Sequence, residues 1–226
     1  MEPIPGVLLG AGGSERFGSE KLLASLPSGE TLFERALEIH LQSQILPLIV
    51  VISPNLGKII RQKTEIFAFS RLRIGKRVDT WHAFSCKWGG GRLIINENFH
   101  KGMSSSVKKG VGCLTDDEKA GGLVISLADL PLLSSETINF FIKKFLKERV
   151  GFLLPVFNDI TGHPVIVDFN RFKNDIARLR GDVGLRSLLT QYPKAVKKIP
   201  WQDDSVIWDI DTPKDLAKLS LKPTSC

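Results

Sequence analysis

A glycine-rich segment directly after a short apolar run constrains this chain more than any other feature. The run Ile4–Leu9 has strand character, and the loop Gly10–Gly13 that follows it holds three glycines. Glycines behind a strand let the backbone turn tightly and bring bare N–H groups close to a ligand. Arg16 and Lys21 add two cations nearby, so we expect the ligand to be an anion, and polyphosphate is the usual one.

The loop departs from the two best-known phosphate-binding loops. A dinucleotide fingerprint would need glycine at the position of Glu15, and a Walker loop would need lysine directly after Gly18, where Ser19 stands. A plain flexible turn with two solvated cations is therefore the alternative interpretation.

The length and composition predict a globular protein outside the membrane. With 226 residues, of which 42% are hydrophobic, the chain can bury a full core as one domain. We expect no membrane span, because no run of about 18 apolar residues occurs. The N-terminus lacks a signal-peptide pattern, so we expect a cytoplasmic location. Cys86, Cys113 and Cys226 show neither a disulfide framework nor a zinc pattern, which predicts reduced thiols.

The formal charge of +7 is compatible with two kinds of partner. It could serve a nucleic acid, or it could attract small anionic substrates. The basic residues are spread along the chain and no RNA motif with interleaved aromatic residues accompanies them. The charge pattern therefore favours small anions over nucleic acid.

The first third of the chain alternates between strand and helix patterns. Thr31 stands in capping-box spacing before Glu34, and a helical apolar face then runs to about Gln44. Leu48–Ile52 is a buried strand in this interpretation, and Leu56–Phe67 is a weaker helix. This order predicts a parallel sheet, whose ligand lies beyond the carboxyl ends of the strands, where the glycine loop is also expected.

The segment 70–91 is poorly periodic and rich in arginine, tryptophan and glycine, so we expect an insertion or mobile loop. A short strand over Arg92–Asn96 follows it. His82, within this segment, is interpreted as an ordinary surface residue because no partner at a catalytic spacing supports another role.

Asp129 follows the apolar run Gly122–Leu127 and precedes Pro131, which would end the strand. A carboxylate at the carboxyl end of a central strand faces the ligand crevice, where phosphates would need a metal ion. A simple Asp–Pro turn is the alternative. An amphipathic helix is expected over Ser135–Glu148.

The last third has a different pattern. Two short runs, Phe152–Val156 and Pro164–Val167, predict a hairpin-like unit, and two short helices are expected around 172–179 and 185–192. A last strand over Val206–Ile210 would place Asp209 and Asp211 on one side, before a closing helix that starts at Pro213. An aspartate just before such a helix is often only a cap.

Six motifs together resemble the MobA-like nucleotidyltransferases over nearly the whole chain, apart from the segment 70–91 and the tail after Leu221. They are the glycine loop from Leu9 to Lys21, Gly-Met-Ser-Ser-Ser at 102–106, Ala-Asp-x-Pro at 128–131, the pair Gly-His-Pro at 162–164 and Gly-Asp-x-Gly-x-Arg at 181–186, and Asp-x-Asp-Thr-Pro-x-Asp-Leu at 209–216. The serine segment follows Asn98 with altered spacing, and Gly10 replaces one family alanine. A serine cluster at a helix start could equally be a cap.

The resemblance implies a Rossmann-like three-layer α/β/α fold with a mostly parallel sheet and a small acceptor-side β-hairpin region. It implies one domain over residues 1–226, with a nucleotide-binding part at about 1–135 and an acceptor-binding part at about 136–226. It also implies an enzyme that moves CMP from CTP to molybdopterin or the molybdenum cofactor with Mg²⁺ and releases pyrophosphate. An acceptor molybdoenzyme would be a further partner.

The resemblance also assigns roles to individual residues. The nucleotide would be bound by Leu9, Ala11, Gly12, Gly13, Ser14, Arg16, Lys21, Ser104, Ser105 and Ser106. The acceptor would be bound by His163, Gly181, Asp182 and Arg186. The catalytic set would be Arg16, Lys21 and Asp129, and Mg²⁺ would be held by Asp129 and Asp211. Without the resemblance, His163 would be a turn residue and Arg186 a surface cation.

Donor and acceptor are the least constrained parts of this interpretation. The guanylyl branch usually has Ala-Gly-Gly where this chain has Gly10-Ala11-Gly12, so CTP is favoured over GTP. A phosphosugar, methylerythritol phosphate or phospholactate could replace the pterin. A non-catalytic protein that delivers the cofactor is a further alternative, although such a protein would not need both metal-binding acids.

Overall fold

The computed structural model describes residues 4–12, 17–67, 70–78, 80–119 and 121–219. The strands are β1 (Ile4–Gly10), β2 (Ile45–Ile52), β3 (Arg73–Val78), β4 (Trp81–Cys86), β5 (Gly89–Ile95), β6 (Leu123–Leu127), β7 (Phe152–Phe157), β8 (Ile160–Thr161), β9 (Val165–Val167) and β10 (Val196–Pro200). The helices are α1 (Leu32–Leu41), α2 (Pro54–Gln62), α3 (Met103–Val111), α4 (Ser135–Glu148), α5 (Phe169–Arg178), α6 (Arg186–Gln191) and α7 (Pro213–Leu219). None of the helices in these ranges is long and apolar enough to span a bilayer.

All the strands belong to one sheet, in the order β10-β7-β9-β6-β1-β2-β5-β4-β3, with β8 paired to β7. The centre is parallel: β1 pairs with both β2 and β6, and β2 pairs with β5. The strands β4 and β9 run antiparallel to their neighbours in the sheet. The carboxyl ends of β6, β1, β2 and β5 therefore meet at one edge, as the strand–helix alternation predicts.

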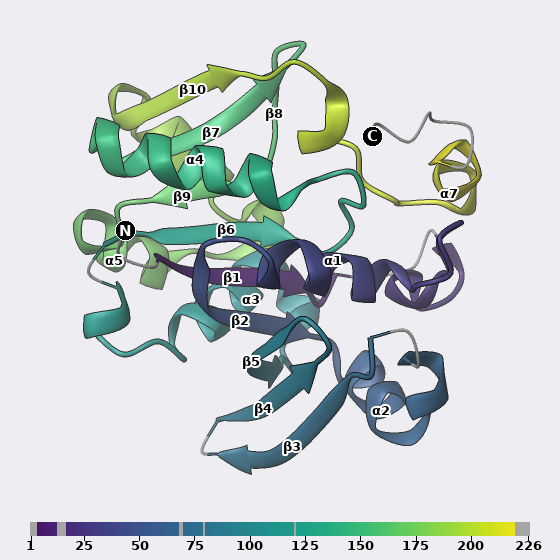
Figure 1. The fold of residues 1–226 in the computed structure, drawn as a ribbon. Helices are drawn as coiled ribbons and strands as arrows, with labels where there is room; N and C mark the ends of the chain where they lie inside the picture. Colours follow the sequence, from purple (N-terminus) through teal and green to yellow (C-terminus); the bar gives the residue numbers. More distant parts are fainter. Residues whose placement is uncertain (1–3, 13–16, 68–69, 79, 120, 220–226) are drawn as a thin grey trace.

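Helices cover both faces of this sheet (Figure 1), which confirms the three-layer α/β/α prediction. One apolar layer joins the sheet to α1, α2 and α4, and it includes the fully buried rings of Phe33 and Phe141. The second layer joins the opposite face to α3, α5 and α6, with Phe152 and Phe172 stacked at a centroid distance of 4.3 Å. A sheet buried on both faces explains why β1 and β6 have nearly continuous apolar sequences.

Several helix boundaries follow from local hydrogen bonds. At α1, Thr31 accepts from the N–H of Glu34, while the Glu34 carboxylate accepts from the N–H of Thr31, which is the predicted capping box. Ser53 and Ser134 cap α2 and α4 in the same sense, each accepting one backbone N–H. The helix α4 spans the predicted residues 135–148.

The segment 70–91 was expected to be an insertion or a mobile loop, and the structure contradicts the loop alternative. This segment forms β3, β4 and the start of β5, an antiparallel extension of the sheet. Its glycines allow close strand contact: a Cβ on Gly91 would lie 2.4 Å from the carbonyl oxygen of Leu48. The glycine run is therefore part of a strand in this protein.

The predicted strand 206–210 is also wrong. The chain there forms a 3-10 turn over Asp204–Val206 and then continues in irregular conformation to α7. The edge strand next to β7 is instead β10, whose residues Val196–Pro200 pair in parallel with β7.

Candidate functional site

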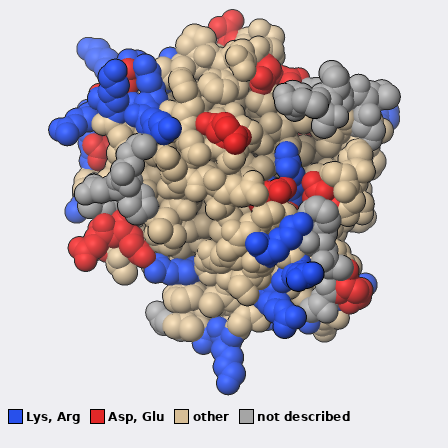
Figure 2. Space-filling model, viewed as in Figure 1, with Lys and Arg blue, Asp and Glu red and all other residues tan. Residues whose placement is uncertain are grey.

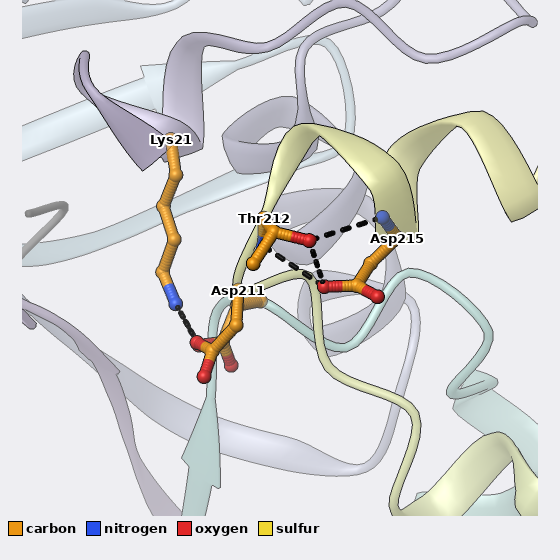
Figure 3. A network of polar contacts seen from close by, with 5 residues as sticks. Lys21, Asp211, Thr212 and Asp215 are labelled. Atoms are coloured by element: carbon orange, nitrogen blue, oxygen red, sulfur yellow. Dashed lines mark hydrogen bonds and ion pairs between the residues drawn. The ribbon is translucent and has the colours of Figure 1, made fainter. Parts of the chain in front are cut away.

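Lys21 lies at the centre of a cluster of charged side chains beyond the carboxyl ends of the central strands. It opens the 3-10 turn Lys21–Leu23 and extends toward the acids (Figure 3). Its Nζ lies 2.7 Å from Oδ2 of Asp129 and 3.0 Å from Oδ1 of Asp211. Residues separated by more than 100 positions thus meet, and both acids predicted as metal ligands contact the same ammonium group.

Backbone hydrogen bonds place the two acids. The N–H of Ala128 donates to the carbonyl of Leu9 at 3.0 Å, which ties the end of β6 to β1. The N–H of Ile210 donates to the carbonyl of Asp129 at 3.0 Å, which brings the irregular segment before α7 alongside β6. This hydrogen bond, rather than pairing within the predicted strand, places the segment that carries Asp211 beside β6.

The cap of α7 is formed by Thr212 and Asp215, not by Asp211. The Asp215 carboxylate accepts from the N–H of Thr212 at 2.9 Å and from its hydroxyl at 2.7 Å, as Figure 3 shows. The N–H of Asp215 in turn donates to the Thr212 hydroxyl. The capping alternative for Asp211 is therefore wrong, and its carboxylate is directed to Lys21.

The electrostatics of the cluster favour an additional cation. Burial lowers the pKa of Lys21, but the nearby Asp129 and Asp211 carboxylates outweigh this effect and raise the pKa above its usual value. Burial raises the pKa of Asp209, and the charges of Asp129 and Asp211 raise it further. The carboxylates of Asp129, Asp209 and Asp211 thus all interact electrostatically with the single ammonium group of Lys21. Oδ1 of Asp129 is buried and has no hydrogen-bond partner within the described part of the chain.

A cavity lies directly beside this cluster, and five of the predicted nucleotide-binding residues line it: Leu9, Ala11, Gly12, Lys21 and Ser106. Asp129 lines it too. Gly13, Ser14 and Arg16 lie outside the described residues, so their predicted roles remain predictions. The cavity wall also includes Phe99 and Met103. Met103 belongs to the motif at 102–106, whereas Phe99 was given no role from the sequence.

The serine segment at the start of α3 is held from the side rather than acting as a cap. The N-cap position is Gly102, and no side chain caps the helix there. Asn96 donates through Nδ2 to the hydroxyls of Ser105 and Ser106, both at 2.9 Å. Asn96, rather than Asn98, is therefore the asparagine whose side chain holds the serines. Ser104 is buried, and its hydroxyl makes no hydrogen bond with the described residues.

A second cavity adjoins the first and collects most of the predicted acceptor residues. His163, Asp182 and Arg186 line it, and Met103, Leu127 and Asp182 line both cavities. Burial lowers the pKa of His163, whose Nδ1 lies 3.4 Å from the carbonyl oxygen of Ile125. The two predicted halves of the site therefore share a wall.

The shared wall is a direct contact between two of the sequence motifs. Asp182 accepts from the N–H of Met103 through Oδ1 at 2.9 Å. A Cβ on Gly102 would lie 2.5 Å from the carbonyl carbon and oxygen of Gly181. Gly181 is thus a packing residue in this contact, and the Asp182 carboxylate holds the start of α3.

The fold and the site together define an α/β protein with two adjoining cavities, one of them lined by Lys21 and Asp129 beyond the carboxyl ends of its central strands. The MobA-like NTP transferase domain matches residues 6–196, and the chain belongs to this family of nucleotidyltransferases.

Relatives and solved structures match over nearly the full length. Nicotine blue oxidoreductase of Paenarthrobacter nicotinovorans is 24% identical, with 96% of each chain covered. Purine catabolism protein PucB of Bacillus subtilis (strain 168) is 28% identical, with 93% of this chain and 92% of PucB covered. The manganese complex of Rv0371c from Mycobacterium tuberculosis H37Rv has a TM-score of 0.71 at 20% identity, covering 97% and 98%. Molybdopterin-guanine dinucleotide biosynthesis protein A of Archaeoglobus fulgidus has a TM-score of 0.62 at 16% identity, with 96% of each chain covered. These structural likenesses support the fold.

Proposed function

We propose that this protein transfers CMP from CTP to molybdopterin or its molybdenum-loaded form and releases pyrophosphate. The observation that carries the proposal is the contact of Lys21 with Asp129 and Asp211 at a cavity that adjoins a second cavity. A donor nucleotide and an acceptor need two neighbouring sites, and these two cavities share Met103, Leu127 and Asp182. Transfer of this kind depends on positioning and on charge neutralisation more than on a protein nucleophile.

In this proposal each cavity binds one of the two substrates. The cavity with Ala11, Gly12 and Ser106 takes the nucleotide, and the one with His163 and Arg186 takes the acceptor. Lys21 stabilises the negative charge that develops on the departing pyrophosphate. Arg186 offers a guanidinium that can bind the acceptor phosphate in a bidentate manner. An acceptor phosphate is already an oxyanion, so the reaction requires no strong general base.

Asp129 and Asp211 are suited to hold a divalent cation. Hard cations such as Mg²⁺ and Mn²⁺ prefer carboxylate oxygens and commonly combine one or two carboxylates with substrate phosphates. The buried Oδ1 of Asp129, which has no hydrogen-bond partner among the described residues, is an oxygen available to such an ion. When bound, the metal neutralises phosphate charge. The manganese in a structural neighbour supports this assignment, and Mg²⁺ is our proposal for this chain.

Pyrophosphate release tests donor and acceptor together. CTP, GTP and ATP are offered separately with molybdopterin and Mg²⁺, and we expect release with CTP. Methylerythritol phosphate and a sugar phosphate serve as alternative acceptors. Release with GTP alone would overturn the donor assignment, and release with another acceptor alone would overturn the pterin. Nucleotide binding without metal-dependent release would favour a delivery protein.

The metal-site part of the proposal has its own variant. Asp129→Asn removes one carboxylate and should lower the pyrophosphate release rate at least about a hundredfold, equivalent to about 2.7 kcal/mol in the activation barrier. Asp117→Asn removes an exposed carboxylate from a turn that lines neither cavity, and it should leave the rate unchanged. Full activity in Asp129→Asn would refute the proposed role of this residue.

A further inference from the structure

A second set of cations forms a groove at the same edge of the sheet. This basic groove consists of two openings that share Asn98 and Lys109. Its cationic lining is Arg61 from α2, Arg77 from β3, Lys109 and Lys108 from α3, and Lys101 just before α3. None of these residues lines the two cavities of the nucleotidyltransferase site.

The groove lies close to the nucleotide cavity but opens elsewhere. It is lined by Ile95, the last residue of β5, whereas the nucleotide cavity lies at the ends of β1 and β6. The hydrogen bonds of Asn96 to Ser105 and Ser106 form the partition, since Ser105 lines the groove and Ser106 lines the nucleotide cavity. The basic groove and the nucleotide cavity therefore lie on opposite sides of the same segment at the start of α3.

Four cations of the groove, Arg61 and the three lysines, form no ion pair within the described chain. Glu97 is the sole carboxylate among its lining residues in the described ranges, and it forms no ion pair there with Arg61 or the three lysines. By contrast, Arg92 on β5 donates to both oxygens of Glu118, at 2.7 and 3.0 Å. The Arg92 guanidinium is thus paired with a carboxylate, in contrast to the guanidinium of Arg61.

Arg61 instead donates to an imidazole. Its Nη2 lies 2.7 Å from Nε2 of His82. A guanidinium has no acceptor atom, so Nε2 accepts and His82 is neutral, with its Nδ1–H directed to the carbonyl of Gly75 at 3.3 Å. Burial, followed by the charges of Arg61 and Arg77, lowers the pKa of His82. The surroundings of this imidazole therefore favour an anion over a further proton.

We propose that the basic groove is a second anion site that binds a small phosphorylated molecule, with Arg61, Arg77 and Lys109 around its phosphoryl groups. Arginine and lysine together give the bidentate and point-charge contacts that phosphate oxygens accept. Thr80 and Asn98 add neutral donors to the same wall. The described lining contains no Phe, Tyr or Trp ring, whereas single-stranded nucleic acid is usually held by stacking of bases on such rings.

Inorganic pyrophosphate in EDTA is the probe, because the reaction site needs a divalent cation to hold it in our proposal. Binding is followed by calorimetry on the full chain and by NMR of the His82 imidazole. We expect saturable binding that shifts the His82 resonances and raises the pKa of this imidazole, which lines one opening together with Arg61, Arg77, Lys109 and Glu97. Arg61→Gln combined with Lys109→Gln should raise the dissociation constant for pyrophosphate at least tenfold.

A matched double variant separates a site from general surface charge. Arg73→Gln with Lys76→Gln also removes two exposed cations, from β3, and neither residue lines the groove. This control should bind pyrophosphate as the wild type does. Equal weakening in both double variants, or binding that leaves His82 unperturbed and is lost in Lys21→Met, would overturn the proposal. Tighter binding of an unstructured single-stranded RNA that shifts His82 would overturn the small-molecule assignment. The outcome does not depend on whether pyrophosphate is released from CTP.

Discussion

Gly102→Ala should reveal how tightly the two halves of the site are joined. Gly102 has φ 89° and ψ 173°, a conformation that is essentially restricted to glycine. An added Cβ would lie 2.5 Å from the carbonyl atoms of Gly181 and 2.7 Å from the N of Asp182. All three neighbours are backbone atoms, so no side-chain rotation can relieve the clash.

The expected loss of stability follows from these two effects. Holding a residue other than glycine in such a conformation costs about 1–3 kcal/mol, and overpacking a close contact costs about 1–3 kcal/mol. Partial movement of the segment after Gly181 would relieve some of the clash. We therefore expect Gly102→Ala to lower the free energy of unfolding by about 2–5 kcal/mol.

Urea unfolding of the full chain measures this loss as a lower midpoint at unchanged slope. Gly121→Ala is the matched control, because no atom lies within 4 Å of its added Cβ and its φ is not in the left-handed region. The control should be neutral or slightly stabilising. A loss below about 0.5 kcal/mol in Gly102→Ala, or an equal loss in both variants, would refute the contact as described.

Three further predictions concern single side chains. Lys21→Met should cost about 1–3 kcal/mol of stability by leaving two acids without their ammonium partner, and Mn²⁺ should restore part of it; no recovery in thermal melts would contradict the metal site. Asp182→Ala should lose about 1 kcal/mol in urea unfolding, and Asp182→Asn less, since its amide oxygen can still accept from Met103; equal losses would refute this. His40 has a pKa of about 4 in the folded protein because it is buried, so the unfolded chain takes up its proton first as the pH falls below about 6.5. Lowering the pH from 7 to 5 should therefore destabilise the wild type by about 2 kcal/mol more than His40→Gln, and parallel pH curves would exclude His40 as the cause.

Local signals in the sequence were sufficient for parts of this fold. The capping box of Thr31 and Glu34 is a contact between residues three positions apart, and it predicts the start of α1 correctly. The apolar run before Asp129 predicts a buried strand, and β6 confirms it. Both cases depend on the spacing of neighbouring residues, which a single sequence contains.

Long-range contacts account for what the sequence did not predict. The segment 70–91 has weak local periodicity, and its strands depend on pairing with β5 next to β2. Asp211 was predicted from a motif, but the segment that carries it is held by a hydrogen bond from Ile210 to Asp129, about 80 residues away. The role of Phe99 in the cavity wall had no signal in spacing, because an apolar residue near a helix start is usually part of the core.

The two outermost strands of the sheet have a consequence for the behaviour of the protein at high concentration. A strand with one unpaired side is a template on which another chain can add. Here β3 contains Arg73, Lys76 and Arg77, while β10 contains Lys198 and a proline, and its Lys197 pairs with Glu148. Lys and Arg side chains are visible near both ends of the sheet in Figure 2. Like charges on both rims repel the rims of a second copy, so the protein should resist edge-to-edge aggregation, most strongly at low ionic strength.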